Sequence, residues 1–201
     1  ARTALTVGTV AVGSGTPVSA ANAKRSDIAA VTGITTVAGG TTNGDVKVRA
    51  GTGNYALTVT KPIVTTAGTA DTASGNVVLE AGGTITLSSS GTDTGTITTS
   101  SNGNAAAGDV FIHQLAGTTN TITLSNAISA KGGASGTANT LSDGGKVTVW
   151  SAQGALSLDS TIDVSKNAAG TNDGSIGLKA TGNISDTTNA NLIGDTNGSL
   201  K

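Results

Sequence analysis

The segment from Gly145 to Lys166, "GKVTVWSAQGALSLDSTIDVSK", decides the fold. It contains three short runs, "KVTVW", "ALSLD" and "TIDVS", in which apolar residues occupy every second position. A period of two is typical of β-strands that bury one face. Serine, glycine and other small residues stand between the runs, as they do at turns. The segment therefore predicts three strands in close succession.

The same pattern recurs along the chain. A glycine followed by alternating apolar residues begins five copies, spaced by 31, 33, 37 and 29 residues, at Gly44, Gly75, Gly108, Gly145 and Gly174. Two further apolar runs follow in each copy, and then comes a variable loop of Gly, Ser, Thr, Asn and Ala. Self-similarity at this period is typical of solenoids, propellers and arrays. Three strands per repeat, with length variation mostly at one corner, indicate the coils of a parallel β-helix.

The predicted fold is all-β: a single right-handed parallel β-helix, or β-solenoid, of about six coils of three short strands, over residues 1–201. Residues 1–43 supply an irregular first coil, in which "GTVAV", "DIAAV" and "GITTV" are expected to be the three strands in order. A propeller is the alternative fold. Its blades need four antiparallel strands and usually recurring aromatic residues, and the sequence shows neither pattern.

Alternation within each strand separates inward from outward side chains. The inward positions are aliphatic, and burying each such side chain is worth roughly 1.5–3 kcal/mol. Only stacking on the next coil completes that burial. In the first strand the predicted inward columns are Val46, Val77, Val110, Val147 and Ile176, and Val48, Leu79, Ile112, Val149 and Leu178. The second and third strands add Leu57, Ile85, Ile122, Leu156 and Ile184, and Ile63, Ile97, Ile128, Ile162 and Leu192.

The composition narrows the function classes. Lys and Arg number 11 against 12 Asp and Glu, so the net charge is −1, and no basic block marks a surface for nucleic acid or an anionic membrane. No apolar run approaches the roughly 20 residues that span a bilayer. The absence of Cys excludes disulfides, thiolate catalysis and Cys-ligated metals. The chain starts at Ala1 without a Met or a signal peptide, so we expect a processed or excised segment. We predict no cofactor, no nucleic-acid partner and no membrane insertion.

One outward column of the first strand concentrates the unusual residues. It is predicted to align Arg49, Glu80, His113, Trp150 and Lys179, which include the only Glu, His and Trp of the chain. A His beside a Glu can be an oriented general base. The alternative is an outer-wall ladder, in which Arg49 pairs with Glu80, Glu80 with His113, His113 stacks on Trp150, and Lys179 lies over the indole. We predict the ladder and no catalytic residue, because no nucleophile or second acid stands in the neighbouring column.

Other outward residues give weaker signals. Val78 and Phe111 fall on adjacent coils and predict a small exposed apolar patch, either packed under a loop or used for binding. Asp159 and Asp163 both point outward and are the best acids for a polysaccharide lyase or hydrolase. Asp186 aligns with an inward position and is expected to end a shortened strand. The segments "TNGD" and "SGTDTG" lack the nonapeptide of calcium-loaded β-rolls, so we predict no metal site.

The stretch "GGKVTVWSAQGALSLDSTIDVSKNAAGTNDGSIGLKATGNIS" resembles the β-helical repeat regions of filamentous-haemagglutinin-type exoproteins and related autotransporter adhesins. The resemblance rests on the Gly-x-apolar-x-apolar-x-Ala strand, the "ATGNI" bend and the corner rich in Gly, Ala and Asn, and it covers roughly Gly44 to Ser185. It implies an extracellular rod on a bacterial surface.

The function predicted first is therefore a non-enzymatic structural protein of an extracellular fibre or adhesin stalk. Its expected partners are copies of itself, adjoining coils of a longer chain, or a glycan or protein of a host or cell surface. A β-helical polysaccharide lyase or hydrolase is one alternative. An ice-binding solenoid is the other, because the second strands present Thr58, Thr86 and Thr123, followed by Ser157 and Ser185.

The ends of the sequence show no amphipathic capping helix, and uncapped solenoid edges invite further stacking. We therefore expect the chain to continue into more coils or to stack end to end. The residues expected at an end-to-end contact are Leu5, Val7, Val10, Val12, Leu192 and Ile193. Sequons at Asn183 and Asn197 matter only in a host that glycosylates them.

Overall fold

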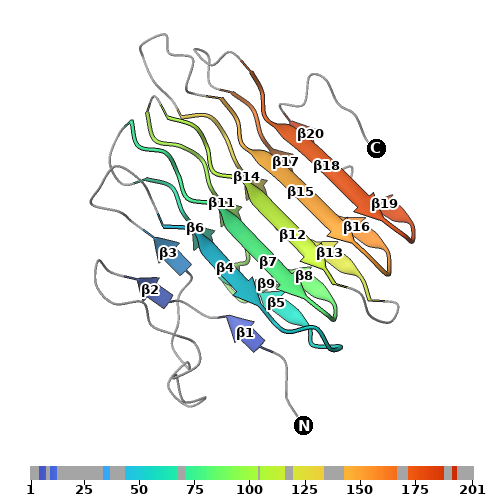
Figure 1. Cartoon of the computed structure of the whole chain (residues 1–201). Helices are drawn as coiled ribbons and strands as arrows, with labels where there is room; N and C mark the ends of the chain where they lie inside the picture. Colours follow the sequence, from blue (N-terminus) through green and yellow to red (C-terminus); the bar gives the residue numbers. More distant parts are fainter. Residues whose placement is uncertain are drawn as a thin grey trace.

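The computed structural model describes residues 5–7, 10–12, 34–36, 44–67, 71–103, 105–115, 120–133, 143–166, 172–187 and 192–193. Every regular element in these ranges is a β-strand, so the predicted all-β class is confirmed. The chain visits three sheets in turn, and its coils stack into a β-solenoid (Figure 1).

The three strands of each repeat go to three different sheets. The first sheet has the order β18 (Ser175–Ala180), β15 (Lys146–Ser151), β12 (Val110–Gln114), β7 (Val77–Ala81) and β4 (Val46–Arg49). The second sheet has the order β1 (Leu5–Val7), β5 (Leu57–Val59), β8 (Ile85–Leu87), β13 (Ile122–Leu124), β16 (Leu156–Leu158) and β19 (Ile184–Asp186). The third sheet has the order β2 (Val10–Val12), β3 (Ile34–Thr36), β6 (Ile63–Val64), β11 (Ile97–Thr98), β14 (Ile128–Ser129), β17 (Ile162–Asp163) and β20 (Leu192–Ile193).

The pairing in these sheets is parallel and follows the glycine alignment. In the first sheet, Val110 lies opposite Val77 on one side and Val147 on the other. In the second, Ile122 lies between Ile85 and Leu156. Because one repeat pairs with the next in the same register, equivalent residues of successive coils form columns that run along the solenoid.

The number of turns differs from the prediction. The described chain makes about 4 turns, fewer than the six coils expected. The strand assignment also differs before Gly44: Val10–Val12 was expected in the first sheet, but it pairs with Ile34–Thr36 in the third, and Leu5–Val7 joins the second. Ile34–Thr36 does occupy the third sheet, as predicted, while "DIAAV" lies outside the described residues.

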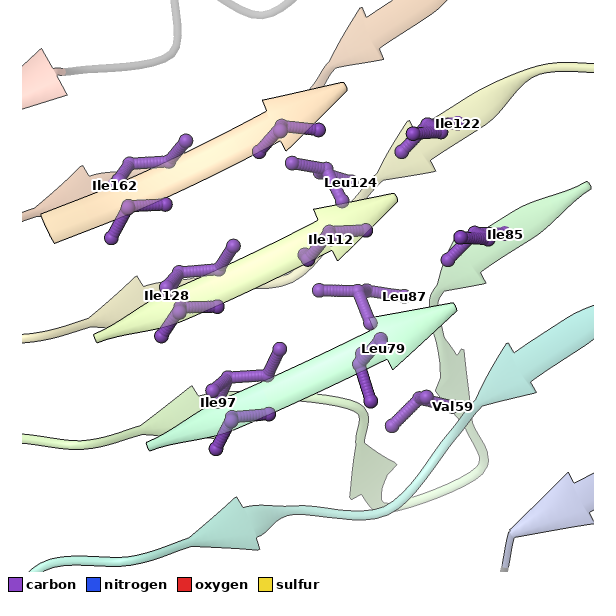
Figure 2. Close-up of a cluster of buried hydrophobic side chains, with 14 of the residues drawn as sticks. Val59, Leu79, Ile85, Leu87, Ile97, Ile112, Ile122, Leu124, Ile128 and Ile162 are labelled. Atoms are coloured by element: carbon purple, nitrogen blue, oxygen red, sulfur yellow. The ribbon is translucent and has the colours of Figure 1, made fainter. Parts of the chain in front are cut away.

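The aliphatic columns fill the interior as predicted. Figure 2 shows Ile97, Ile128 and Ile162 stacked in one column, with Leu79 and Ile112 beside them. All five side chains are at most 1% exposed. Parallel stacking puts like side chains in contact at the strand spacing of about 4.8 Å, so each coil covers the apolar surface of its neighbour.

Two inward positions depart from full burial. Ile184 was expected in the core, but its side chain is 48% exposed. It lies in β19, the last strand of the second sheet, so no further strand of that sheet among the described residues covers it. Val48 lies in β4, the strand at the opposite edge of the first sheet, and is only partly buried. Burial at the ends varies, however, because Val46 on β4 and Leu178 on β18, which also lie on edge strands, are only 6% and 2% exposed.

Each coil closes at a corner where the third strand leads towards the next first strand. The amide of Gly108 donates to the carbonyl of Thr99 at 2.8 Å, and the buried hydroxyl of Thr99 donates to the carbonyl of Gly108 at 2.7 Å. Thr65 and Gly75 form the same reciprocal pair. The variable loop leaves and returns at this pair, so its length can change without disturbing the core.

Successive corner glycines lie too close together for a side chain. A Cβ built on Gly75, Gly108, Gly145 or Gly174 would lie 2.3, 2.0, 2.3 or 2.0 Å, respectively, from the carbonyl oxygen of the preceding corner glycine, the first of which is Gly44. Contacts this short between a Cβ and a backbone oxygen require the backbone to move. The glycine is thus required by coil-to-coil distance in the four later repeats, whereas a Cβ on Gly44 would meet Thr36 at an ordinary 3.8 Å.

Residues that follow the corner glycines bond one coil to the next. Asp45 Oδ1 accepts from the amide of Asn76 at 2.7 Å, and Asn76 Oδ1 accepts from the amide of Asp109 at 2.8 Å. Asp109 Oδ1 accepts from the amide of Lys146 at 2.7 Å. In this column Asn76 keeps two carboxylates off neighbouring coils, and each side-chain oxygen also satisfies an amide of the next coil.

An antiparallel hairpin leaves the coil between the second and third sheets. Its strands are β9 (Ser89–Ser90) and β10 (Asp93–Thr94), joined through Gly91 at φ 64°. Asp93 forms an ion pair with Lys61 of the preceding coil, and Ser89 Oγ donates to Asn126 Oδ1 of the following coil at 3.1 Å. The hairpin, which the sequence did not predict, therefore connects three coils.

We predict that Ile112→Asp destabilises the protein by several kcal/mol, because the side chain is fully buried and an unpaired charge would enter the apolar stack. Lys47→Thr is the matched control on the outer wall, where the Lys47 side chain is 62% exposed and its ion pair is worth at most about 1 kcal/mol. Urea unfolding followed by circular dichroism measures both. Equal losses of stability would show that the inward and outward registers are wrong.

Gly108→Ala is expected to destabilise by more than 1 kcal/mol (order of magnitude), because the new Cβ would overlap the carbonyl of Gly75. Gly177→Ala is the control: it lies in a strand of the same sheet, and a Cβ there would meet Thr148 atoms at ordinary contact distances of 3.8 and 4.0 Å. Thermal unfolding of the two variants makes the comparison. A Gly108→Ala variant as stable as Gly177→Ala would contradict the close-approach argument.

Candidate functional site

The outer-wall ladder lies on the solvent side of the first sheet. Its residues are direct partners across four consecutive strand pairs, with Arg49 opposite Glu80, Glu80 opposite His113, His113 opposite Trp150, and Trp150 opposite Lys179. Alternation places them outward because the residues on either side of them along each strand point into the core. The strand pairing thus brings together, in the predicted order, all five residues of the predicted ladder.

At one end of the ladder, Glu80 is neutralised by two cations of the preceding coil. Its Oε2 lies 3.3 Å from Lys47 Nζ and 3.9 Å from Arg49 Nε. The Glu80 side chain is 14% exposed, whereas both cations are largely exposed. The sequence predicted the contact with Arg49 but not the shorter one with Lys47, which comes from the neighbouring outward column.

At the other end, the aromatic rings stack along the solenoid axis. The rings of His113 and Trp150 are 4.4 Å apart and inclined by 16°, and Lys179 Nζ lies 4.8 Å from the centroid of the Trp150 ring. Phe111, two residues before His113 on the same strand, lies 5.4 Å from it at 43°. The coils before and after Trp150 supply His113 and Lys179, so its two ring faces meet protein groups.

The chemistry of His113 follows from this packing. Burial lowers the pKa of His113, and the negative charge of Glu80 acts in the opposite direction without cancelling the effect of burial. The imidazole is therefore neutral near pH 7. An acid–base pair needs a hydrogen bond to the carboxylate that orients the imidazole. In the described structure Glu80 instead forms ion pairs with Lys47 and Arg49, and no Glu80–His113 hydrogen bond is present.

Val78 and Phe111, the predicted apolar patch, lie opposite each other on β7 and β12. Both side chains are partly buried. Phe111 also contacts His113, so this pair of residues extends the aromatic end of the ladder across the sheet towards Lys47, which is the partner of Val78 on β4. The patch is continuous with the ladder.

The two aspartates considered as acids of a lyase or hydrolase are both engaged. Asp159 accepts hydrogen bonds from the hydroxyls of Ser157 and Thr187. Asp163 lies 3.3 Å from Lys131 and accepts from the amide and hydroxyl of Ser165. Burial by itself would raise the pKa of Asp163, but the bonds from Ser165 and the charge of Lys131 outweigh burial and lower it. A lowered pKa suits a permanently ionised carboxylate rather than a general acid.

Asp186 lies opposite Leu158, as the alignment predicts, and it is exposed within the terminal strand β19. Among the residues that the structure describes, no three His, Asp or Glu side chains gather as ligands for a metal ion. The described part also contains no helix of the length and apolarity needed to cross a membrane.

The residues expected at an end-to-end contact lie on terminal strands. Leu5–Val7 and Val10–Val12 form the first strands of the second and third sheets, and Leu192–Ile193 forms the last strand of the third. Each of these strands pairs on one side only within the described chain. Their side chains lie outside the described part.

Sequence reasoning missed one buried polar cluster. Gln114, fully buried, occupies the inward position that Ala81 holds on one neighbouring coil and Ser151 on the other. Its Oε1 accepts from the amide of Gln153 at 3.1 Å and from the hydroxyl of Ser151 at 3.4 Å. The signal was available, since Gln114 stands at an inward step of the alternation, and the bonds give it a structural role.

Comparison with protein-family models, with curated protein sequences and with solved structures gave no match. The class of protein is therefore defined by the fold itself: the chain is a β-solenoid of stacked parallel coils.

The lowered pKa of His113 predicts a pH dependence of stability. The unfolded chain takes up this proton near the ordinary pKa of about 6.5, before the folded chain does, so stability falls as the pH drops from 7 through that value towards the folded pKa. His113→Gln, which removes the only histidine, should flatten this part of the stability curve and cost about 0.5–1.5 kcal/mol of stacking at pH 7.

Chemical denaturation at several pH values between 7 and 5 measures the effect. Asp163, whose pKa is lowered from 3.8, titrates below this window and leaves the comparison unaffected. An unchanged slope in His113→Gln would contradict the assignment of the lowered pKa to the stacked imidazole.

Proposed function

We propose that this solenoid is a non-enzymatic structural section of an extracellular bacterial fibre or adhesin stalk. The observation that supports the proposal most strongly is the uninterrupted register of the first sheet, in which every ladder residue contacts the coil before or after it. The resemblance of its repeats to those of filamentous-haemagglutinin-type exoproteins and autotransporter adhesins supports the same role.

The way the charged groups are used also favours a structural role. Glu80 binds Lys47 and Arg49, and Asp163 binds Lys131, in each case across two coils. Contacts of this kind hold a stack together along its axis. The solenoid then serves chiefly as a spacer, which holds other parts of the fibre at a distance from the cell. Those parts would contact a glycan or protein of a host or cell surface.

Two arrangements continue the rod. In one, further coils of the same polypeptide adjoin the described ones. In the other, copies of this chain stack head to tail, with the edge of β20 of one copy on the edge of β2 of the next, because these strands end the third sheet on opposite sides. Such a contact is heterologous and gives an open filament rather than a closed ring.

Head-to-tail stacking predicts that the 201-residue chain forms filaments whose length grows with concentration, seen by electron microscopy. Lys introduced at both Val10 and Val12 should shorten them, because charge on the terminal strand disfavours further pairing. Lys at Thr98 and Thr148, on the outer faces of interior strands, is the matched control and should leave the lengths unchanged.

Each result bears on a separate part of the proposal. Chains that stay monomeric at high concentration would exclude head-to-tail stacking. Filaments of unchanged length in the Val10 and Val12 variant would exclude the contact between the third sheets. A hydrolytic or lyase activity on an acidic polysaccharide that is lost in Asp159→Asn would overturn the structural role itself.

A further inference from the structure

The outer face of the second sheet is a regular array of hydroxyl groups. Each of β5, β8 and β13 has two buried residues with one outward residue between them, and one further outward residue precedes and follows the strand. The strand registers align these outward positions in three columns. Backbone bonds from Leu57 to Thr84 and from Ile85 to Thr121 continue the alignment one residue before the strands. Eight of the nine positions carry a hydroxyl, and we call these the threonine face: Thr58, Thr60, Thr84, Thr86, Ser88, Thr121, Thr123 and Ser125.

The side-chain hydroxyls of the threonine face have no protein partner among the described residues, unlike several hydroxyls in and beside the third sheet. Thr36, Thr65 and Thr99 of the third sheet donate to glycine carbonyls, and Ser100 bonds Ser129. By contrast, none of the side-chain hydroxyls of the threonine face makes a hydrogen bond to another described residue. Each is accessible to solvent, so its donor and its acceptor sites are available to water.

The threonine face also has no charge. Its ninth position is Ala56, and the β9–β10 hairpin begins beyond its outer column, at Ser89. Charged residues make up roughly 25–35% of an ordinary soluble surface. Among the described residues, the first charged position in line with this face is Asp159, which follows Ser125 in the outer column on the next coil, and the ladder lies on the first sheet. A neutral face of this kind fits a neutral, hydrogen-bonding partner.

We propose that the threonine face binds ice. Its hydroxyls repeat at about 4.8 Å from coil to coil and at about 6.6–6.8 Å from one outward residue to the next along a strand. Six of the eight residues are threonines, so a methyl group accompanies the hydroxyl. A rigid lattice of such hydroxyls holds water molecules in rows of fixed spacing. Water ordered in rows can join the surface of a growing ice crystal and anchor the protein there.

The face is better suited to ice than to the flat surface of a crystalline polysaccharide. Sugar rings are recognised by stacking on aromatic faces, but the three aromatic residues of the chain all lie outside the threonine face. Trp150, the largest of them, already has His113 and Lys179 against its ring. Binding to ice requires only hydrogen-bonding groups at regular intervals on a rigid support, and the stacked coils provide that support. This activity is independent of the proposed role as a fibre.

The test is thermal hysteresis and inhibition of ice recrystallisation by the whole chain. The unmodified protein is expected to show both, and the double variant Thr86→Tyr with Thr123→Tyr should lose both, because two bulky rings would break the flat array. Thr98→Tyr is the matched control: it places the same ring on the outer face of the third sheet, where Thr98 is also partly exposed, and should retain activity.

Circular dichroism melting establishes that each variant is folded. If the double variant does not fold, Thr86→Lys replaces it, since this single outward change puts a charge at the centre of the face and should also abolish activity. A protein without effect on ice at any soluble concentration would overturn the proposal. So would a folded double variant, or a folded Thr86→Lys variant, that keeps full activity, or an equal loss in Thr98→Tyr. None of these results affects the filament lengths that test the structural role.

Discussion

The structure depends on how closely one coil lies on the next at the glycine corner. The carbonyl oxygen of Gly75 would lie 2.0 Å from a Cβ on Gly108, so the backbone spacing at this corner is available to glycine alone. That spacing lets the aliphatic columns make contact along their whole length, and most of the favourable free energy of folding comes from this burial. The reciprocal bonds between Thr99 and Gly108 hold the corner in place.

Much of this arrangement could be predicted from the sequence, because the repeat converts a three-dimensional problem into a one-dimensional alignment. Once the glycines are aligned, the position of His113 beside Trp150 follows from counting, and the structure places them face to face. The same counting identifies the inward side chains. The alternation within a strand and the stacking of coils require the same residues at the same positions. Because both requirements agree, the inward and outward positions can be predicted from the sequence.

The sequence was less informative where the repeat stops or where contacts cross between columns. Val10–Val12 has the apolar alternation of any strand, so nothing in it distinguishes the first sheet from the third, where it lies. Ile184 has the pattern of a core residue, but it lies on the last strand of the second sheet and its side chain is exposed, which its sequence pattern does not reveal. Lys47 and Glu80 are not direct partners across the strand pair, because Lys47 lies opposite Val78 and Glu80 opposite Arg49. An alignment of columns shows direct partners only, so it does not reveal this diagonal ion pair.

Column stacking also explains why the three faces differ in chemistry. A column of identical charges would set like charges against each other at about 4.8 Å on every coil, at a cost of several tenths of a kcal/mol or more for each pair. The ladder of the first sheet accordingly varies from coil to coil, from Arg49 through Glu80 to Lys179. Hydroxyl and methyl groups carry no such penalty, so a neutral column can repeat the same residue on successive coils, as Thr58, Thr86 and Thr123 do.

This difference separates the tasks that the faces can perform. A uniform neutral face suits a partner that is itself periodic, whereas a varied charged face distinguishes one neighbouring coil from another. In a head-to-tail stack with β20 on β2, two strand positions of the first sheet separate β18 of one copy from β4 of the next, because β2 and β3 precede β6 in the third sheet while the described first sheet begins at β4. A coil with an acidic residue opposite Lys179 would gain an ion pair of the kind that Glu80 makes with Arg49, whereas a basic residue there would cost a few tenths of a kcal/mol. The ladder therefore selects a neighbouring coil by charge, and the aliphatic columns, which accept any coil of the right spacing, supply the adhesion.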